Sequence, residues 1–115
     1  PPVVCLPGKL NQVFMNILTN SILAMEDQGD IFIETGKRQE KARISIRDTG
    51  KGMPPEVREH IFEPFFTTRP VGQGTGLGLS ITYSIVEEHL GNIEVESEPG
   101  KGTEFIITIP FQRNE

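Results

Sequence analysis

The sequence predicts an α+β fold of two layers, with helices packed on one face of a mixed, mostly antiparallel sheet. Three observations predict it. Apolar residues recur at helical spacing near the start of the chain. Four later segments alternate between apolar and polar residues, as strands with one buried face do. Strands grouped in hairpins and separated by helices favour one sheet covered on a single side. The 115 residues suit a single domain, 1–115.

The first expected element is a helix over Lys9–Met25. Asn16 and Asn20 lie four residues apart and therefore share a face of this helix. That face runs beside an apolar stripe of Leu10, Val13, Phe14, Ile17, Leu18, Ser21, Ala24 and Met25.

Strands are expected next in two hairpins. Their ranges are Ile31–Thr35, Ala42–Asp48, Ile93–Ser97 and Thr103–Pro110. The charged residues 37–41 and the glycine-rich residues 98–102 are expected to form the turns.

Helices are expected between the two hairpins. A short helix is expected over Pro54–Phe62, with proline in its first turn. A glycine-rich loop, Gly72–Gly78, leads into a helix over Leu79–Leu90, which Gly91 ends.

Composition limits the classes of function. Apolar residues make up 36% and charged residues 23%, too apolar a balance for disorder. The net charge of -5 gives no basic field for nucleic acid or an anionic membrane. Cys5 is the only cysteine, so no internal disulfide forms and a cytoplasmic setting is expected. No apolar run reaches the ~20 residues of a membrane span. The opening Pro-Pro-Val-Val lacks a basic leader, so no signal peptide is expected there. The chain is expected to be a piece excised from a longer protein, and that parent protein could be anchored in a membrane.

Asp48 is the first candidate for a ligand-binding residue. The alternation in Ile44–Asp48 puts this carboxylate on the apolar face, where it needs a hydrogen-bond donor. The glycines of Thr49–Gly52 let a ligand approach the backbone. An ionised carboxylate only accepts hydrogen bonds, which suits the exocyclic amine of adenine rather than the oxygen of guanine. The alternative is an aspartate that begins a tight turn.

Two further features point to an anionic ligand with a metal. Asparagine is unfavourable inside a helix, so Asn16 and Asn20 suggest oxygens aimed into a cleft, where they suit magnesium. Surface polarity or internal hydrogen bonding is the alternative for this pair. The alternating glycines of Gly72–Gly78 expose amides at a helix N-terminus, which forms an anion site. Their spacing matches neither a dinucleotide fingerprint nor a P-loop.

The remaining candidates are an arginine, two histidines and an aromatic cluster. Arg69 can reach a terminal phosphate or simply remain solvated. His60 and His89 lack metal-ligand spacing and are expected to be structural. A dense aromatic cluster is either core or a docking surface, and it comprises Phe62, Phe65 and Phe66.

In this order, the motifs resemble those of the catalytic domain of sensor histidine kinases, within the Bergerat-type ATP-binding fold. Gln12–Ser21 resembles the N box, Asp48–Met53 the first glycine box and Ile61–Phe66 the F box. Gly74–Leu79 resembles the second glycine box, and Gly102–Phe105 resembles the last. The resemblance runs from about Leu10 to Pro110, and five ordered motifs are more specific than any single one.

The resemblance implies roles for individual residues. Asn20 would bind Mg²⁺ through its side-chain oxygen, and Asn16 would support the phosphate end; with Arg69 these are the expected catalytic residues. Asp48 would accept from adenine. The other expected ATP-binding residues are Gly50, Gly52, Thr68, Gly74, Thr75, Gly76, Leu77, Gly78 and Thr103. The segment from about Thr67 to Gly74 would form a mobile lid, and the F box would fix that lid or grip the helical domain.

Two positions refine the resemblance. Many sensor kinases carry lysine three residues after the metal-binding asparagine, and here that residue is Leu23. Neutralising the charge of the γ-phosphate would then depend more on Mg²⁺ and Arg69. Other ATPases of this fold carry a glutamate one turn before that asparagine to activate water; here it is Asn16, which cannot act as a base.

The resemblance implies a histidine kinase domain that binds ATP and Mg²⁺ and phosphorylates a histidine on a separate dimeric helical domain. A response regulator would act downstream, without nucleic acid or direct membrane contact. An ATP-gated interaction module that transfers no phosphate is the alternative from another class. A serine kinase acting on a regulatory partner is a third.

Overall fold

A single antiparallel sheet forms one layer of the protein, and two long helices form the other. The computed structural model describes residues 7–25, 28–66 and 78–110. In chain order the elements are α1 (Pro7–Met25), β1 (Ile31–Arg38), β2 (Lys41–Asp48), α2 (Pro55–Arg58), α3 (Gly78–Glu88), β3 (Asn92–Glu98) and β4 (Gly102–Pro110). The α+β class and the two layers are therefore confirmed.

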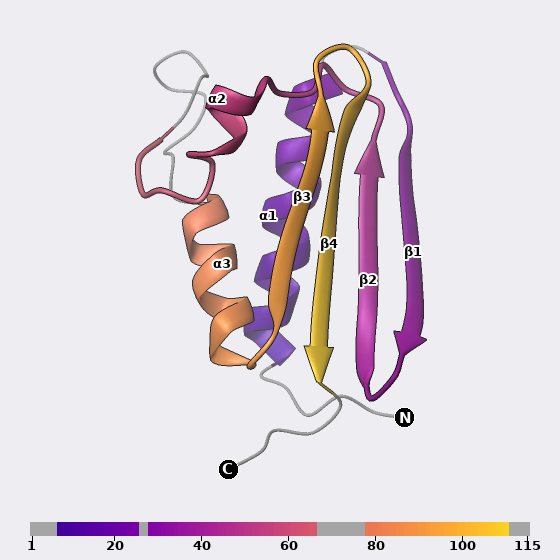
Figure 1. Cartoon of the computed structure of the whole chain (residues 1–115), viewed down its shortest axis with the longest axis vertical. Helices are drawn as coiled ribbons and strands as arrows, with labels where there is room; N and C mark the ends of the chain where they lie inside the picture. The colour runs from indigo at the N-terminus through magenta and orange to yellow at the C-terminus, as the bar shows by residue number, and fades with distance from the viewer. Residues whose placement is uncertain (1–6, 26–27, 67–77, 111–115) are drawn as a thin grey trace.

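The strands lie in the order β1-β2-β4-β3, and every pairing among them is antiparallel. The central pair joins β2 to β4, which are separated in the chain by α2, α3 and β3. Helices α1 and α3 pack against each other over one face of the sheet, and β1 lies at the far edge (Figure 1). This arrangement brings the end of β2 beside the start of β4, where the candidate site lies.

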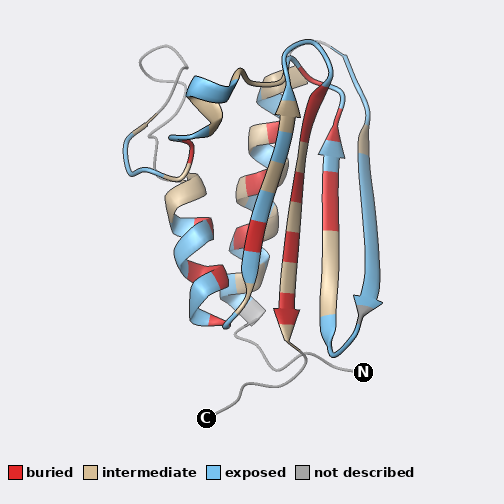
Figure 2. Ribbon diagram, viewed as in Figure 1, coloured by how far each residue is buried: buried red, intermediate tan, exposed pale blue. Residues whose placement is uncertain are grey.

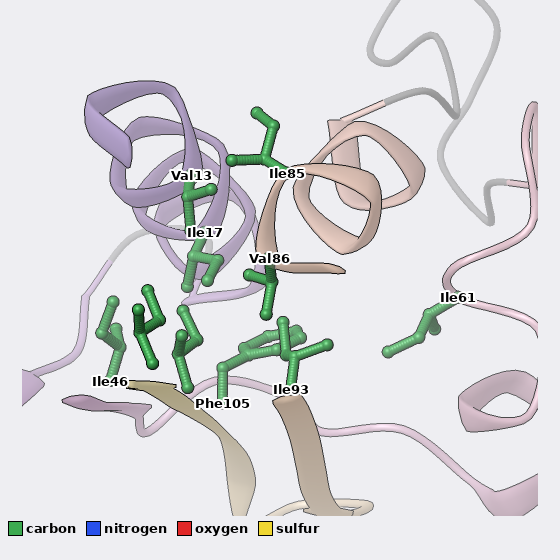
Figure 3. Packing of buried hydrophobic residues seen from close by; sticks show 10 residues of the cluster. Val13, Ile17, Ile46, Ile61, Ile85, Val86, Ile93 and Phe105 are labelled. Carbon is green, nitrogen blue, oxygen red and sulfur yellow. The ribbon is translucent and has the colours of Figure 1, made fainter. Parts of the chain in front are cut away.

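The core lies between the helices and the inner face of the sheet. Val13 and Ile17 on α1 and Val86 on α3 point toward Ile46 and Phe105 on the strands (Figure 3). Each of these five side chains is essentially inaccessible to water. Burying such a side chain stabilises the fold by about 1.5–3 kcal/mol. The predicted stripe of α1 is confirmed, because its most buried members face this core.

The hairpins and helices differ from the expected boundaries by a few residues. Strand β1 continues through Gly36, Lys37 and Arg38, so only Gln39 and Glu40 form the turn. Gln39 adopts a positive φ of 59° there. Charged residues are tolerated in β1 because it is an edge strand that is exposed along nearly all its length (Figure 2). Helix α2 is a single turn, and α3 ends at Glu88 before Leu90, which has φ 59°.

Candidate functional site

The end of β2 carries a buried carboxylate at the centre of the candidate site. Asp48 is 1% exposed, as the strand alternation predicts. Its Oδ1 accepts hydrogen bonds from the backbone N–H groups of Gly50 at 2.9 Å and Thr103 at 3.3 Å. The donors that the buried carboxylate needs are thus backbone amides from its own loop and from the neighbouring strand. They hold the side chain in one orientation.

The second oxygen of this carboxylate has no hydrogen-bond partner among the described residues. Asp48 Oδ2 and Ser21 Oγ are the buried side-chain oxygens of the described chain that lack a hydrogen bond. Leaving a buried polar atom unsatisfied costs about 1–3 kcal/mol, more for a charged group. Such an atom in a native protein calls for a ligand or an ordered water. The strand alternation predicted that the carboxylate points inward. Ser21 was predicted only as a member of the apolar stripe and not as a site residue.

Three glycines bring backbone segments into close contact around Asp48. A Cβ at Gly102, where φ is 99°, would lie 2.0 Å from the carbonyl oxygen of Asp48. At Gly52, where φ is 70°, it would lie 1.9 Å from the carbonyl oxygen of Glu98. A Cβ at Gly50 would meet the carbonyl oxygen of Ala24 at 2.8 Å. Only glycine allows these approaches, so the first and last glycine motifs form one structural unit beside α1.

Ser97, at the end of β3, ties this unit together and was not singled out from the sequence. Its Oγ accepts the backbone N–H of Met53 at 2.8 Å and donates to the carbonyl oxygen of Gly102 at 3.0 Å. It also lies 2.8 Å from Thr103 Oγ1. A serine at a strand end has no local pattern that marks it, because its partners come from two other segments.

The asparagines of α1 lie on the flank that faces α3. Asn16 Nδ2 donates to the carbonyl oxygen of Gly78 at 3.0 Å and to Thr82 Oγ1 at 3.3 Å. Thr82, buried and also missed from the sequence, donates in turn to the Gly78 carbonyl at 2.9 Å. The Asn16 amide therefore fastens α1 to the first turn of α3. Asn20 lies one turn along α1 and is partly buried.

Leu23 follows Asn20 by three residues, which places it on the same flank of α1. It is 42% exposed, so no packing requirement of the core demands leucine there. The described residues contain no cluster of three or more His, Cys, Asp or Glu side chains that could hold a metal. A metal in this region would therefore depend on amide oxygens and on the oxygens of its ligand.

Several predicted site residues lie outside the described residues. They are Thr68, Arg69, Gly74, Thr75, Gly76 and Leu77. Gly78 is described, as the first residue of α3. The predicted lid, from about Thr67 to Gly74, also lies outside the described residues.

The two histidines bond to residues three or four positions away in the chain. His89 is buried, and its Nδ1 is 2.9 Å from the carbonyl oxygen of Ile85, a structural contact as expected. His60 is exposed and bonds to Glu63. That hydrogen bond, followed by the charges of Glu63 and Glu59, raises the pKa of His60. Phe65 is 72% exposed.

A groove of about 330 Å³ lies between α1, α3 and the segment that follows α2. It is lined by Lys9, Gln12, Pro64, Ser80, Ile81, Ser84 and Ile85.

The described residues contain no helix that could span a membrane.

Comparison with known proteins gives the family. Residues 5–113 match the family described as "Histidine kinase-, DNA gyrase B-, and HSP90-like ATPase". The chain belongs to this ATPase family. Within it, the similar proteins are sensor kinases: sporulation kinase E of Bacillus subtilis is 49% identical over 115 residues. The match covers 99% of this chain but only 15% of that kinase, so the chain corresponds to one part of a much longer protein.

Solved structures place the chain in the histidine kinase branch of the family. The catalytic domain of histidine kinase ThkA superposes with a TM-score of 0.83 at 40% identity, covering 95% of this chain and 70% of that one. Full-length ShkA, solved in complex with AMPPNP, gives a TM-score of 0.81 at 32% identity. That match covers 93% of this chain and 22% of ShkA. The chain has the fold of a histidine kinase catalytic domain.

Proposed function

We propose that this chain binds Mg-ATP and transfers its γ-phosphoryl group to a histidine on a separate, dimeric helical domain of the parent protein. The observation that carries the proposal is the buried carboxylate of Asp48: backbone amides hold one oxygen, and the other has no partner in the part of the chain that the structure describes. The family and the AMPPNP complex of ShkA support a nucleotide as the ligand.

Adenine fits the unpartnered oxygen of Asp48. Its exocyclic amine is a donor, and an ionised carboxylate can only accept. Guanine presents an oxygen at the matching position, which would put two acceptors together. The close backbone contacts at Gly50, Gly52 and Gly102 make a thin, preformed wall against which a flat base can lie.

The phosphates would extend along the flank of α1 toward Asn16, Asn20 and the first residue of α3. The contact between Asn16 and Gly78 holds the N-terminal end of α3 on this side of the molecule. Such an end attracts anions. Mg²⁺ takes few protein ligands when it shares phosphate oxygens, so Asn20 would supply a single oxygen. Arg69 and the amides of 74–78 would then contact the phosphates.

The site lacks an acid–base residue at Asn16, because an amide cannot accept a proton from water at neutral pH. Phosphoryl transfer depends mainly on positioning and on neutralising charge rather than on such a base. The chain would therefore hold ATP for delivery to another protein group. Alone it would bind ATP and phosphorylate little, with the reaction in the cytoplasm and a response regulator as the final acceptor.

The exposed apolar side chains beside the groove suit the helical domain as a partner. Phe65, Ile81 and Tyr83 are all exposed, and the Tyr83 ring stands 5.3 Å from that of Phe62. Exposed aromatic residues next to a groove are typical of contact sites for another protein surface. The F box, Ile61–Phe66, would thus dock the acceptor domain close to the lid.

A second candidate is an ATP-gated interaction module, which binds ATP without transferring it. Leu23 favours this candidate, because an exposed apolar residue stands where a lysine would neutralise phosphate charge.

The test mixes this chain with the separately produced helical domain and γ-labelled ATP. Acid-labile label on the helical domain is the expected result. At ATP concentrations below saturation it should fall strongly with Asp48→Asn, and this chain incubated alone should acquire little label. Tight ATP binding without transfer of label would instead select the interaction module.

A further inference from the structure

Three side chains form a row across the sheet at the edge of the candidate base pocket. Asp48 on β2 is the register partner of Thr103 on β4, and Thr103 is the register partner of Ser97 on β3. Residues directly opposite each other on neighbouring strands lie on the same face. All three therefore stand on the inner face, which Ile46 and Phe105 continue into the core.

The other hydrogen bonds of Ser97 decide which hydroxyl donates in the hydrogen bond between Ser97 and Thr103. A serine hydroxyl has one proton to donate and two lone pairs that accept. Here Ser97 Oγ donates to the carbonyl oxygen of Gly102 and accepts the N–H of Met53. One lone pair is left for Thr103, whose Oγ1 lies 2.8 Å away. The bond between the two hydroxyls must then run from Thr103 to Ser97.

The opposite direction would leave the Gly102 carbonyl without the Ser97 proton. Ser97 is partly buried and Thr103 is buried, so water does not readily replace a lost bond there. Fully satisfied networks hold one arrangement, because each alternative leaves a polar atom unpaired.

We propose that Ser97 is a positioning residue for base selection: it takes the proton of Thr103 and thereby makes Thr103 Oγ1 a hydrogen-bond acceptor beside Asp48 Oδ2. With its proton committed, Thr103 offers only lone pairs. Asp48 Oδ2 also offers only lone pairs. The row thus presents two neighbouring acceptors to the ligand, which selects a purine carrying a 6-amino group and disfavours a 6-oxo purine.

This inference rests on the proposed nucleotide site and assigns a residue outside it. Ser97 does not itself need to touch the ligand. Its hydroxyl works through Thr103, and its bond to Met53 also fixes the end of the loop that follows Asp48. Loss of the hydroxyl frees the Thr103 proton, so that Thr103 can donate to an oxygen at the 6 position.

The experiment compares the affinities of ATP and inosine triphosphate, which differ at the 6 position, for the wild type and for Ser97→Ala. The ratio of the two dissociation constants is the readout. Ser97→Ala is expected to lower the preference for ATP by about tenfold, the effect of one net hydrogen bond. Ser97→Thr keeps the hydroxyl and should restore the preference. A purely structural defect would weaken both nucleotides equally and leave the ratio unchanged.

Thr103→Val provides a second test that does not depend on the fold tolerating Ser97→Ala. It should lower the same ratio, and adding Ser97→Ala to it should lower the ratio no further. An unchanged ratio in Ser97→Ala, or additive losses in the double variant, would overturn the inference while leaving ATP binding intact. A wild type that binds neither nucleotide would overturn the proposed function itself.

Discussion

Replacing the Asp48 carboxylate with an amide separates base recognition from folding. In Asp48→Asn, Oδ1 is retained and can still accept the N–H groups of Gly50 and Thr103. The atom that changes is Oδ2, which has no partner within the described chain. An amide nitrogen at that position is a hydrogen-bond donor, as is the exocyclic amine of adenine, so no hydrogen bond forms between them.

The expected loss is one hydrogen bond to a charged group, about 1.5–3 kcal/mol of binding free energy. That corresponds to roughly a 10- to 150-fold weaker ATP affinity. The fold should persist, because both backbone bonds remain. Titration calorimetry with Mg²⁺ present measures the affinity, and thermal unfolding followed by circular dichroism checks the fold.

Glu34→Gln is the matched control. It makes the same change from carboxylate to amide at an exposed position of β1. ATP affinity should be unaffected by it. The reasoning fails if Asp48→Asn folds and binds ATP as tightly as the wild type, or if Glu34→Gln weakens binding to the same degree.

Three further changes follow from the geometry. Gly102→Ala should cost more unfolding free energy in urea than Gly100→Ala. Both residues have a positive φ, which costs alanine about 1–3 kcal/mol of strain. A Cβ at Gly102 would also clash with backbone, whereas a Cβ at Gly100 would have no atom within 4 Å. Equal costs for the two variants would contradict the close approach at Gly102. Leu23→Lys should tighten ATP binding about fivefold at low salt, with adenosine unaffected, because the added charge can reach only phosphates; an equal gain for adenosine would contradict this. The pKa of His60 is raised, first by its hydrogen bond with Glu63. The pair's contribution to folding stability is therefore complete below the ordinary histidine pKa and is lost as the pH rises through the raised pKa. His60→Gln should therefore flatten the melting temperature across that window, and an unchanged profile would argue against the bond.

Local periodicity was enough to predict most of the fold. The α1 stripe and the four strands are visible in the sequence because each burial pattern repeats within a few residues. The alternation in β2 also placed Asp48 on the inner face, where it is buried. The end of β1 was missed because its charges resemble a turn, while an edge strand beyond the helical layer accepts them.

Contacts between distant segments were not predictable in the same way. The bond from Thr103 to Asp48 joins residues 55 positions apart, and the bond from Asn16 to Thr82 joins residues 66 apart. Both depend on register and helix packing, which no local pattern encodes. Ser97 was missed for this reason. The predicted phosphate contacts of Arg69 and the second glycine motif stay predictions.

The central claim is that a nucleotide site selective for adenine lies beside Asp48, and titration of the wild-type chain with ATP and GTP tests it most directly. ATP is expected to bind, Mg²⁺ to strengthen its binding, and GTP to bind far more weakly. Equal binding of the two nucleotides, or no binding of ATP by the folded chain, would contradict it.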